Sequence, residues 1–148
     1  MLDQPPQTAL REAIEGLYFA YRAFTDRPDR ILERRGLGRA HHRILYFVGR
    51  NPGLSVSGLL GVLGVSKQAI NAPLRQLIEM KLVASGSLAA DKRTKSLRLT
   101  PEGEKLESEL TGSQMRLLES ALGGDNAGLQ APLIEALQRI AASGSDLA

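Results

Sequence analysis

The sequence predicts a mainly α-helical fold with one small β-hairpin. Apolar residues recur at spacings of three and four over most of the 148 residues, which is the period of an amphipathic helix. The stretch from Leu82 to Thr100 differs, because short apolar segments there surround a polar turn, as in a hairpin. A chain of this length buries a hydrophobic core without metals or disulfides, so we expect one compact domain per chain.

Two helices are expected in the N-terminal part of the chain. An apolar stripe that begins at Leu10 and Ile14 predicts a helix over residues 8–25, and we expect Pro28 to break it because proline lacks a backbone donor. Two glycines then release the chain into a helix over residues 39–49. The residues expected on its buried side are Ile44, Leu45 and Val48.

The next two helices form the most informative segment. Ser55 and Ser66 are each placed to cap a helix, and Gly64 between the helices accepts the left-handed conformation that ends the first of them. Two helices joined by a short turn that contains glycine have the spacing of a helix-turn-helix. The apolar residues expected along this pair are Val56, Leu59, Leu60, Leu63, Ile70, Leu74, Leu77 and Ile78.

The polar side of the second helix of the pair suits contact with DNA bases. Gln68, Asn71 and Arg75 follow one another at helical spacings. Asn and Gln bind adenine edges, Arg binds guanine and Ala contacts the thymine methyl group, so this side is typical of a helix laid in the major groove. The residues expected to contact DNA are Ser66, Lys67, Gln68, Asn71, Ala72 and Arg75. The alternative is an ordinary solvated helix surface.

The hairpin has a charged tip. Leu97 and Leu99 alternate with polar residues in a strand, and residues 89–94 are expected to form the polar turn before it. An arginine at such a tip can enter the narrow, strongly negative minor groove, and Asp91 is placed to hold the guanidinium of Arg93. The tip residues expected to contact DNA are Asp91, Lys92, Arg93 and Lys95. The alternative is a tip that is charged only because it is exposed.

Two helices are expected after the hairpin. Thr100 followed by Pro101 is the preferred order of a capping residue and a first helical residue, and we expect this helix to end at Gly123. Pro132 marks the first turn of a last helix. The apolar residues of the two helices are Leu106, Leu110, Leu117, Leu118, Ala121, Leu129, Leu133, Ile134, Leu137 and Ile140.

The positive charge of the chain is concentrated at its centre. Residues 39–99 carry ten basic side chains against two acidic ones, a net charge of +8, whereas residues 1–38 sum to zero and residues 100–148 sum to −5. A basic centre between neutral and acidic flanks favours a polyanionic partner for the centre alone. The alternative is a solvated basic surface without a partner.

Composition and spacing argue against several other classes of function. A chain without cysteine has no disulfide, no thiol nucleophile and no thiolate metal site. Its longest apolar run, residues 59–65, is far below the ~18 residues of a membrane span, so we expect a cytoplasmic protein without a membrane partner. His41 and His42 are adjacent and cannot chelate one ion as an i, i+4 pair does, and no dinucleotide loop or nucleophile elbow is present. We therefore expect no enzymatic activity, no cofactor and no metal.

Residues from about Leu37 to Leu106 resemble the winged helix-turn-helix of the MarR family of bacterial transcription regulators. The matching segments are residues 52–56, 63–70, 91–93 and 99–103, whose order and spacing together are specific although each is weak alone. The resemblance implies a homodimer that reads a pseudo-palindromic double-stranded DNA operator. It also implies a minor-groove contact by Arg93.

The resemblance further implies how the chain is divided within its one compact domain. Residues 1–38 correspond to an N-terminal dimerisation helix region, residues 39–100 to a winged helix-turn-helix DNA-binding lobe, and residues 101–148 to C-terminal helices that complete the dimerisation region. A small organic effector, often an aromatic acid or another anion, is implied between the dimer helices and the lobe. The candidate contacts are Tyr18, Tyr21, His42 and Tyr46, and the alternative is that these side chains belong to the core or the dimer interface.

The sequence thus predicts a sequence-specific DNA-binding transcriptional regulator, a dimeric repressor modulated by a small ligand. The alternative is a winged-helix module that binds an acidic protein surface and no DNA. Two features keep that alternative open: Pro73 lies inside the expected DNA-reading helix, and residues 84–87 lack the arginine common at the start of the wing.

Overall fold

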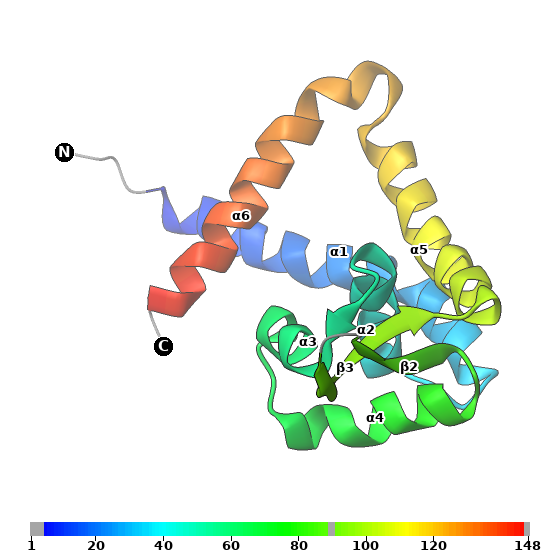
Figure 1. Cartoon of the computed structure of the whole chain (residues 1–148). Helices are drawn as coiled ribbons and strands as arrows, with labels where there is room; N and C mark the ends of the chain where they lie inside the picture. Colours follow the sequence, from blue (N-terminus) through cyan, green and yellow to red (C-terminus); the bar gives the residue numbers. More distant parts are fainter. Residues whose placement is uncertain (1–4, 89–90, 147–148) are drawn as a thin grey trace. The chain divides into compact units, whose positions relative to one another are not determined.

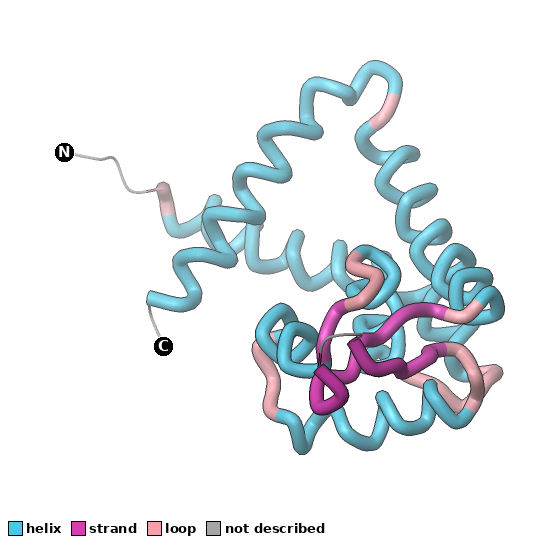
Figure 2. The backbone as a smooth tube through the Cα atoms, viewed as in Figure 1, coloured by secondary structure: helices cyan, strands magenta, loops and turns pink. Residues whose placement is uncertain are grey.

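The chain folds mainly into helices, as predicted, and the part that the structure describes has three strands gathered among them (Figures 1 and 2). The computed structural model describes residues 5–88 and 91–146, without the side chains of residues 87–94 and 145–146. The elements are α1 (Gln7–Glu33), α2 (Arg39–Arg50), β1 (Leu54–Ser55), α3 (Val56–Leu63), α4 (Lys67–Glu79), β2 (Val83–Leu88), β3 (Asp91–Leu99), α5 (Pro101–Leu122), the 3-10 helix η1 (Gly124–Leu129) and α6 (Gln130–Asp146). The chain divides into two compact units, residues 1–114 and 115–148.

The sheet is antiparallel, with strand order β1-β3-β2. The predicted hairpin is present, and its register pairs Val83 with Leu99 at the base. The turn predicted over residues 89–94 is too long, because β3 already begins at Asp91. Backbone pairing extends the strand beyond its apolar part, and alternation of side chains does not report that extension. The two-residue strand β1 is not predicted either, since two residues show no alternation.

The hydrophobic core lies in the first unit, where the helix-turn-helix, the sheet and α5 meet. All three residues predicted on the buried side of α2 are buried, and so are Leu59 of α3 and the apolar residues Ile70, Leu74 and Leu77 of α4. The remaining core residues are Leu32, Leu37, Leu82, Val83, Leu97, Leu106 and Leu110. The apolar periodicity therefore identifies the residues that hold the lobe together.

Helix α1 is longer than predicted, because Pro28 does not end it. Proline at this position removes the donor that the carbonyl group of Phe24 would receive within the helix. The side chain of Gln114 replaces that donor, with its Nε2 atom 3.3 Å from the carbonyl oxygen of Phe24. A tertiary hydrogen bond thus lets the helix continue to Glu33.

The expected helix caps are present. The hydroxyl groups of Ser55, Ser66 and Thr100 accept hydrogen bonds from the backbone N–H groups of the third residue beyond each, at 2.9, 3.2 and 3.0 Å. Gly64 ends α3 with a φ of +66°, in the left-handed region that glycine accepts without strain. These local signals fix where α3, α4 and α5 start and how the chain turns before α4.

The end of α4 is joined closely to the start of α5. Lys81 adopts a φ of +60°, and the N–H of Leu82 then reaches the carbonyl oxygen of Leu77 at 2.9 Å, which completes a helix C-cap. The hydroxyl group of Thr100 donates to the carbonyl oxygen of Lys81 at 2.6 Å. Gly103 faces the carbonyl oxygen of Leu82 so closely that a side chain has no space there.

Both units carry apolar side chains that face solvent in the single chain. On α1 they follow a stripe that includes Leu10, Ile14, Leu17, Tyr18 and Tyr21. In the second unit they include Leu129, Ile134, Leu137 and Ile140, and the described side chains of α6 include none that is buried. Apolar stripes of this extent mark surfaces that another surface covers.

Candidate nucleic-acid interface

Helix α4 presents the predicted DNA-contacting residues on its solvent side. Its buried residues Ile70, Leu74 and Leu77 pack toward the core, which turns the opposite side outward. The side chains that are exposed there belong to Lys67, Gln68, Asn71, Ala72 and Arg75, with Ser66 as the cap before them. Polar groups of these types on one helix can reach base edges of a duplex without rearranging the core.

Pro73 does not interrupt this helix. The helix runs unbroken from Lys67 to Glu79 although Pro73 cannot donate to the carbonyl group of Ala69. Ala69 is exposed, so water can satisfy that carbonyl group, and the pyrrolidine ring is half-buried. The proline therefore leaves the polar surface of α4 continuous.

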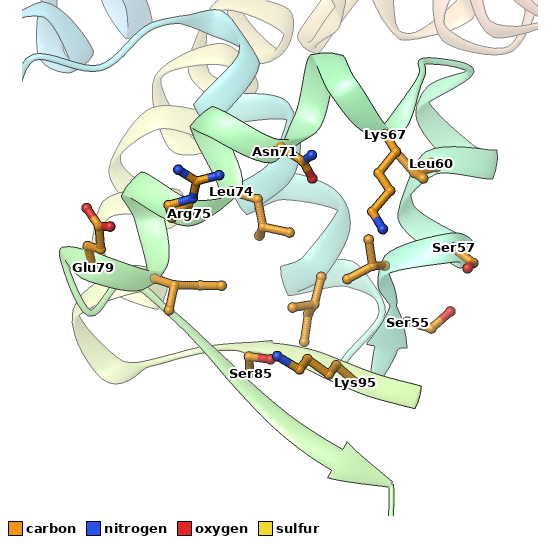
Figure 3. A pocket seen from close by; sticks show the side chains of 13 residues that line it. Ser55, Ser57, Leu60, Lys67, Asn71, Leu74, Arg75, Glu79, Ser85 and Lys95 are labelled. Atoms are coloured by element: carbon orange, nitrogen blue, oxygen red, sulfur yellow. The ribbon is translucent and has the colours of Figure 1, made fainter. Parts of the chain in front are cut away.

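A groove of about 610 Å³ runs beside α4, between this helix, the start of α3 and the sheet (Figure 3). Lys67 extends from α4 into the groove and Lys95 lies along its opposite wall, near Ser85 (Figure 3). Arg75 also lines the groove, and Glu79 is the acidic residue in its wall. Among the lining residues that the structure describes, three cations stand against one carboxylate, which makes this groove attractive to an anion or to a phosphate backbone.

Ser57, Ser85 and Glu79 line the groove but are not part of the sequence prediction. Serine and glutamate on exposed surfaces carry no periodic signal, so only the fold brings them beside Lys67. Of the predicted wing residues, Lys95 is exposed on β3. The side chains of Asp91, Lys92 and Arg93 lie outside the described residues, so their contacts with DNA stay a prediction.

On the side of α4 away from the groove, hydrogen bonds join this helix to α2 and to the turn before α2. Nε2 of His41 lies 2.9 Å from Oε1 of Gln76, and the Nε2 group of Gln76 donates to the carbonyl oxygen of Gly36 at 3.5 Å. The backbone N–H of Gly38 donates to Nδ1 of His41 at 2.9 Å. Since Nδ1 accepts this bond, Nε2 carries the proton and donates to Gln76. Sequence reasoning missed Gln76 because a single glutamine at a half-buried position has no recognisable pattern.

The four candidate effector contacts are only partly brought together. Tyr21 receives a hydrogen bond from Nη2 of Arg43 at 3.4 Å and lies beneath the guanidinium of Arg39, which joins α1 to α2. His42 reaches Thr111 of α5 at 3.4 Å. Tyr18 and Tyr46, by contrast, make edge-to-face contacts with Phe19 and Phe47, their neighbours in their own helices.

Burial and charge at the junction of α1 and α2 shift the pKa of two groups. Asp29 binds Arg39 through both carboxylate oxygens and raises the pKa of this guanidinium. Burial lowers the pKa of His42, an effect that Asp29 opposes and Arg43 reinforces. His42 is therefore favoured in its neutral form.

The described part of the chain holds neither a metal centre nor a membrane-spanning helix. Among the side chains that the structure describes, those of residues 5–86 and 95–144, no three His, Asp or Glu residues gather as a metal centre requires. Across residues 5–88 and 91–146, each helix is too short or too polar to cross a lipid bilayer.

Comparison with known proteins places this fold in a family. Residues 35–94 match the model of the MarR family. The HTH-type transcriptional regulator PetP of Rhodobacter capsulatus is 49% identical over 112 residues, which cover 76% of this chain and 68% of that protein. Two proteins that share this level of identity over more than two thirds of each chain are members of one family.

Solved structures show the same fold at lower identity. The crystal structure of a MarR family transcription regulator superimposes with a TM-score of 0.76 at 23% identity, covering 96% of both chains. Staphylococcus aureus MarR in complex with salicylate and kanamycin matches with a TM-score of 0.73 at 19% identity, over 92% of this chain and 94% of that one. The helix-turn-helix, the hairpin and the relative at 49% identity all indicate the same family. The chain belongs to the MarR family of DNA-binding transcriptional regulators, a non-enzymatic class.

Proposed function

We propose that the chain acts as a homodimer that binds a pseudo-palindromic operator in double-stranded DNA and represses transcription from it. The observation that carries this proposal is the exposed polar side of α4, with Gln68, Asn71 and Arg75 directed to solvent next to a basic groove. A helix inserted in the major groove reads bases with such residues, while lysines beside it bind phosphates.

The exposed apolar stripes support the homodimer. Ile14 of α1 is 65% exposed and Ile134 of α6 is 54% exposed, and each belongs to a stripe of apolar residues at helical spacing. Leaving such stripes in water is unfavourable by about 25 cal/mol for each Å² of apolar surface. A second copy of the chain supplies matching stripes, and two recognition helices related by a two-fold axis read two half-sites one helical turn apart.

A small organic effector is the third part of the proposal. The staphylococcal structure with salicylate and kanamycin supports it by analogy of fold. In this chain, Tyr21 and His42 are the predicted contacts that make bonds between helices. An effector shifts DNA binding only if it binds the DNA-free arrangement more tightly than the DNA-bound one.

Selection of bound sequences from a random duplex pool, followed by titration of the selected operator at several salt concentrations, tests the DNA-binding proposal. We expect a pseudo-palindrome to be enriched and the logarithm of the association constant to fall linearly with the logarithm of the salt concentration. Retention of no duplex at low salt would refute it. Capture of an acidic protein without DNA binding would favour the interaction module instead.

Two substitutions separate base reading from phosphate binding. Asn71→Ala should relax the preference at one operator position by about 1–3 kcal/mol, whereas Arg93→Ala should weaken binding to all duplexes. Arg139→Ala is the matched control, because it also removes one positive charge but lies on α6, paired with Glu135. Equal losses of Asn71→Ala on the operator and on random DNA would contradict a base-reading role.

A further inference from the structure

We propose that the turn between α1 and α2, residues 34–38, is a second phosphate-binding element, and that Gln76 and His41 hold it beside α4. The proposal rests on the DNA-binding function proposed above and names a contact that this function does not require. It assigns DNA contact to Arg34 and Arg35 and a positioning role to Gln76 and His41.

The position of the turn relative to α4 is the first argument. Lys67, Asn71 and Arg75 follow one another at spacings of four and line the groove next to the sheet. Gln76 points away from that groove, because its amide reaches the carbonyl group of Gly36 in the turn. Helix α4 therefore has the basic groove on one flank and the arginine-bearing turn on the other.

A DNA duplex offers one phosphate backbone to each of the two flanks of α4. A helix in the major groove lies between two phosphate backbones, one along each side, because the groove is about 12 Å wide and a helix with its side chains fills it. The groove with Lys67 and Lys95 faces one backbone. The turn with Arg34 and Arg35 then faces the other.

The contacts of the turn show that it is held in place. Gly36 has a φ of +70°, and the N–H of Leu37 donates to the carbonyl oxygen of Leu32 at 2.9 Å, so the turn caps α1 tightly. Gln76 ties the turn to α4, and His41 holds Gln76 from the start of α2. A fixed turn loses little entropy when its side chains bind phosphate.

The charges of the turn are available to an anion. Arg34 and Arg35 are exposed, and neither forms an ion pair with any side chain that the structure describes. Other arginines nearby are engaged, since Arg30 pairs with Asp26 and Arg39 with Asp29. Glu33 precedes the pair, which leaves residues 33–35 with a net charge of +1.

Titration of a duplex operator with the full-length double variant Arg34→Ala/Arg35→Ala tests the phosphate contact. We expect weaker binding to specific and random duplexes alike, an unchanged sequence preference, and a salt slope reduced by about 2 for each subunit of the dimer, since each lost phosphate contact removes about 0.9. Arg30→Ala/Arg34→Ala is the matched control, with the same charge but one arginine of the turn retained, and its slope should fall by about 1 for each subunit. Equal slopes for the two variants would overturn the proposal.

A second set of variants tests the positioning role. His41→Gln keeps an acceptor for the N–H of Gly38, because glutamine is a normal residue at this position of a capping box, but it loses the bond to Gln76. We expect His41→Gln and Gln76→Ala to lower the salt slope in the wild-type background and to have no further effect once Arg34 and Arg35 are alanine. Additive losses in that background would show that Gln76 and His41 serve the fold alone.

The outcomes separate this inference from the function beneath it. Wild-type protein that binds duplex with a salt slope that the double variant leaves unchanged refutes the turn contact and retains the regulator. Wild-type protein that binds no duplex at any salt concentration refutes both. A melting temperature measured for every variant identifies any loss of binding that comes from unfolding.

Discussion

Gly103 lies where the first turn of α5 passes the carbonyl group of Leu82. A Cβ atom at this position would collide with that backbone oxygen, which is fixed by the N–H of Thr100 at 3.1 Å. Gly103→Ala should therefore lower the free energy of unfolding by about 1–3 kcal/mol, the usual range for overpacking. Urea denaturation followed by circular dichroism measures the change.

Gly61→Ala provides the matched control for that prediction. A Cβ atom at Gly61, in the interior of α3, meets no other atom within 4 Å. The same substitution should raise the free energy of unfolding there, by about 0.5–1 kcal/mol, because alanine favours the helix. A stable Gly103→Ala variant would contradict the close approach of α5 to Leu82.

His42 gives the stability of the protein a dependence on pH. Burial lowers the pKa of its imidazole in the folded state below the ordinary value of 6.5, so the unfolded chain binds a proton at a higher pH than the folded one does. The free energy of unfolding should therefore fall as the pH drops below about 6.5. Denaturation at about pH 7.5 and at about pH 5.5 measures the change in the free energy of unfolding, because these values lie on either side of the ordinary histidine pKa.

The variant His42→Gln isolates this contribution. It removes the titrating group and keeps a polar side chain opposite Thr111. The loss of stability between the two pH values should be smaller in the variant than in the wild-type protein. An identical loss in both proteins would assign the dependence to other groups.

At the scale of elements, α1 depends on a side chain from α5. The Nε2 group of Gln114 satisfies the carbonyl group of Phe24, which Pro28 leaves without its helical donor. Gln114→Leu should lower the free energy of unfolding by about 1–3 kcal/mol, because a partly buried carbonyl group loses its partner. Chemical denaturation measures this loss.

A double-mutant cycle shows whether the proline is the reason. Pro28→Ala restores the N–H that can donate to Phe24 within the helix. In that background, Gln114→Leu should have a clearly smaller effect on the free energy of unfolding. Equal effects in the two backgrounds would mean that Gln114 acts by packing rather than through this hydrogen bond.

The helix caps and the end of α1 show where sequence reasoning succeeds and where it stops. Periodicity and caps predicted α2 and α3, the start of α4 at Ser66 and that of α5 at Thr100, since these signals are local. The end of α1 was wrong because the bond that rescues Pro28 comes from a residue far along the chain. Long-range hydrogen bonds leave no periodic trace in the sequence.

In the candidate site, too, local patterns were predicted and contacts between separate elements were not. The exposed side of α4 is deduced from the apolar residues opposite it, so Gln68, Asn71 and Arg75 were assigned to solvent correctly. The groove wall formed by Ser57 and Ser85 and the bond between His41 and Gln76 require the fold, because they join separate elements. The roles of these residues in DNA binding stay predictions.

At the scale of the whole molecule, the apolar stripes on α1 and α6 set the expected oligomeric state. Ile134→Glu/Leu137→Glu places two charges on exposed apolar positions of α6. We expect the wild-type protein to sediment as a dimer and this variant as a monomer that binds the operator at least tenfold more weakly, because charges in an apolar interface are left without partners. Sedimentation velocity and operator titration measure the two effects.

The control for the dimer prediction uses the polar side of the same helix. Arg139→Glu is an exposed substitution in α6 outside the apolar stripe. It should leave the sedimentation coefficient unchanged. Dimers that survive Ile134→Glu/Leu137→Glu would place the dimer interface elsewhere in the chain.

The left-handed backbone of Lys81 makes one residue affect both the stability of the lobe and its attraction to a polyanion. A non-glycine residue in this conformation is disfavoured by about 1–2 kcal/mol, whereas glycine accepts it and loses about 0.5–1 kcal/mol in chain entropy. Lys81→Gly should therefore give a slightly more stable lobe, but one whose central charge is +7 instead of +8. Lysine at this position therefore keeps one of the positive charges that attract a polyanion, at the cost of a less favourable backbone conformation.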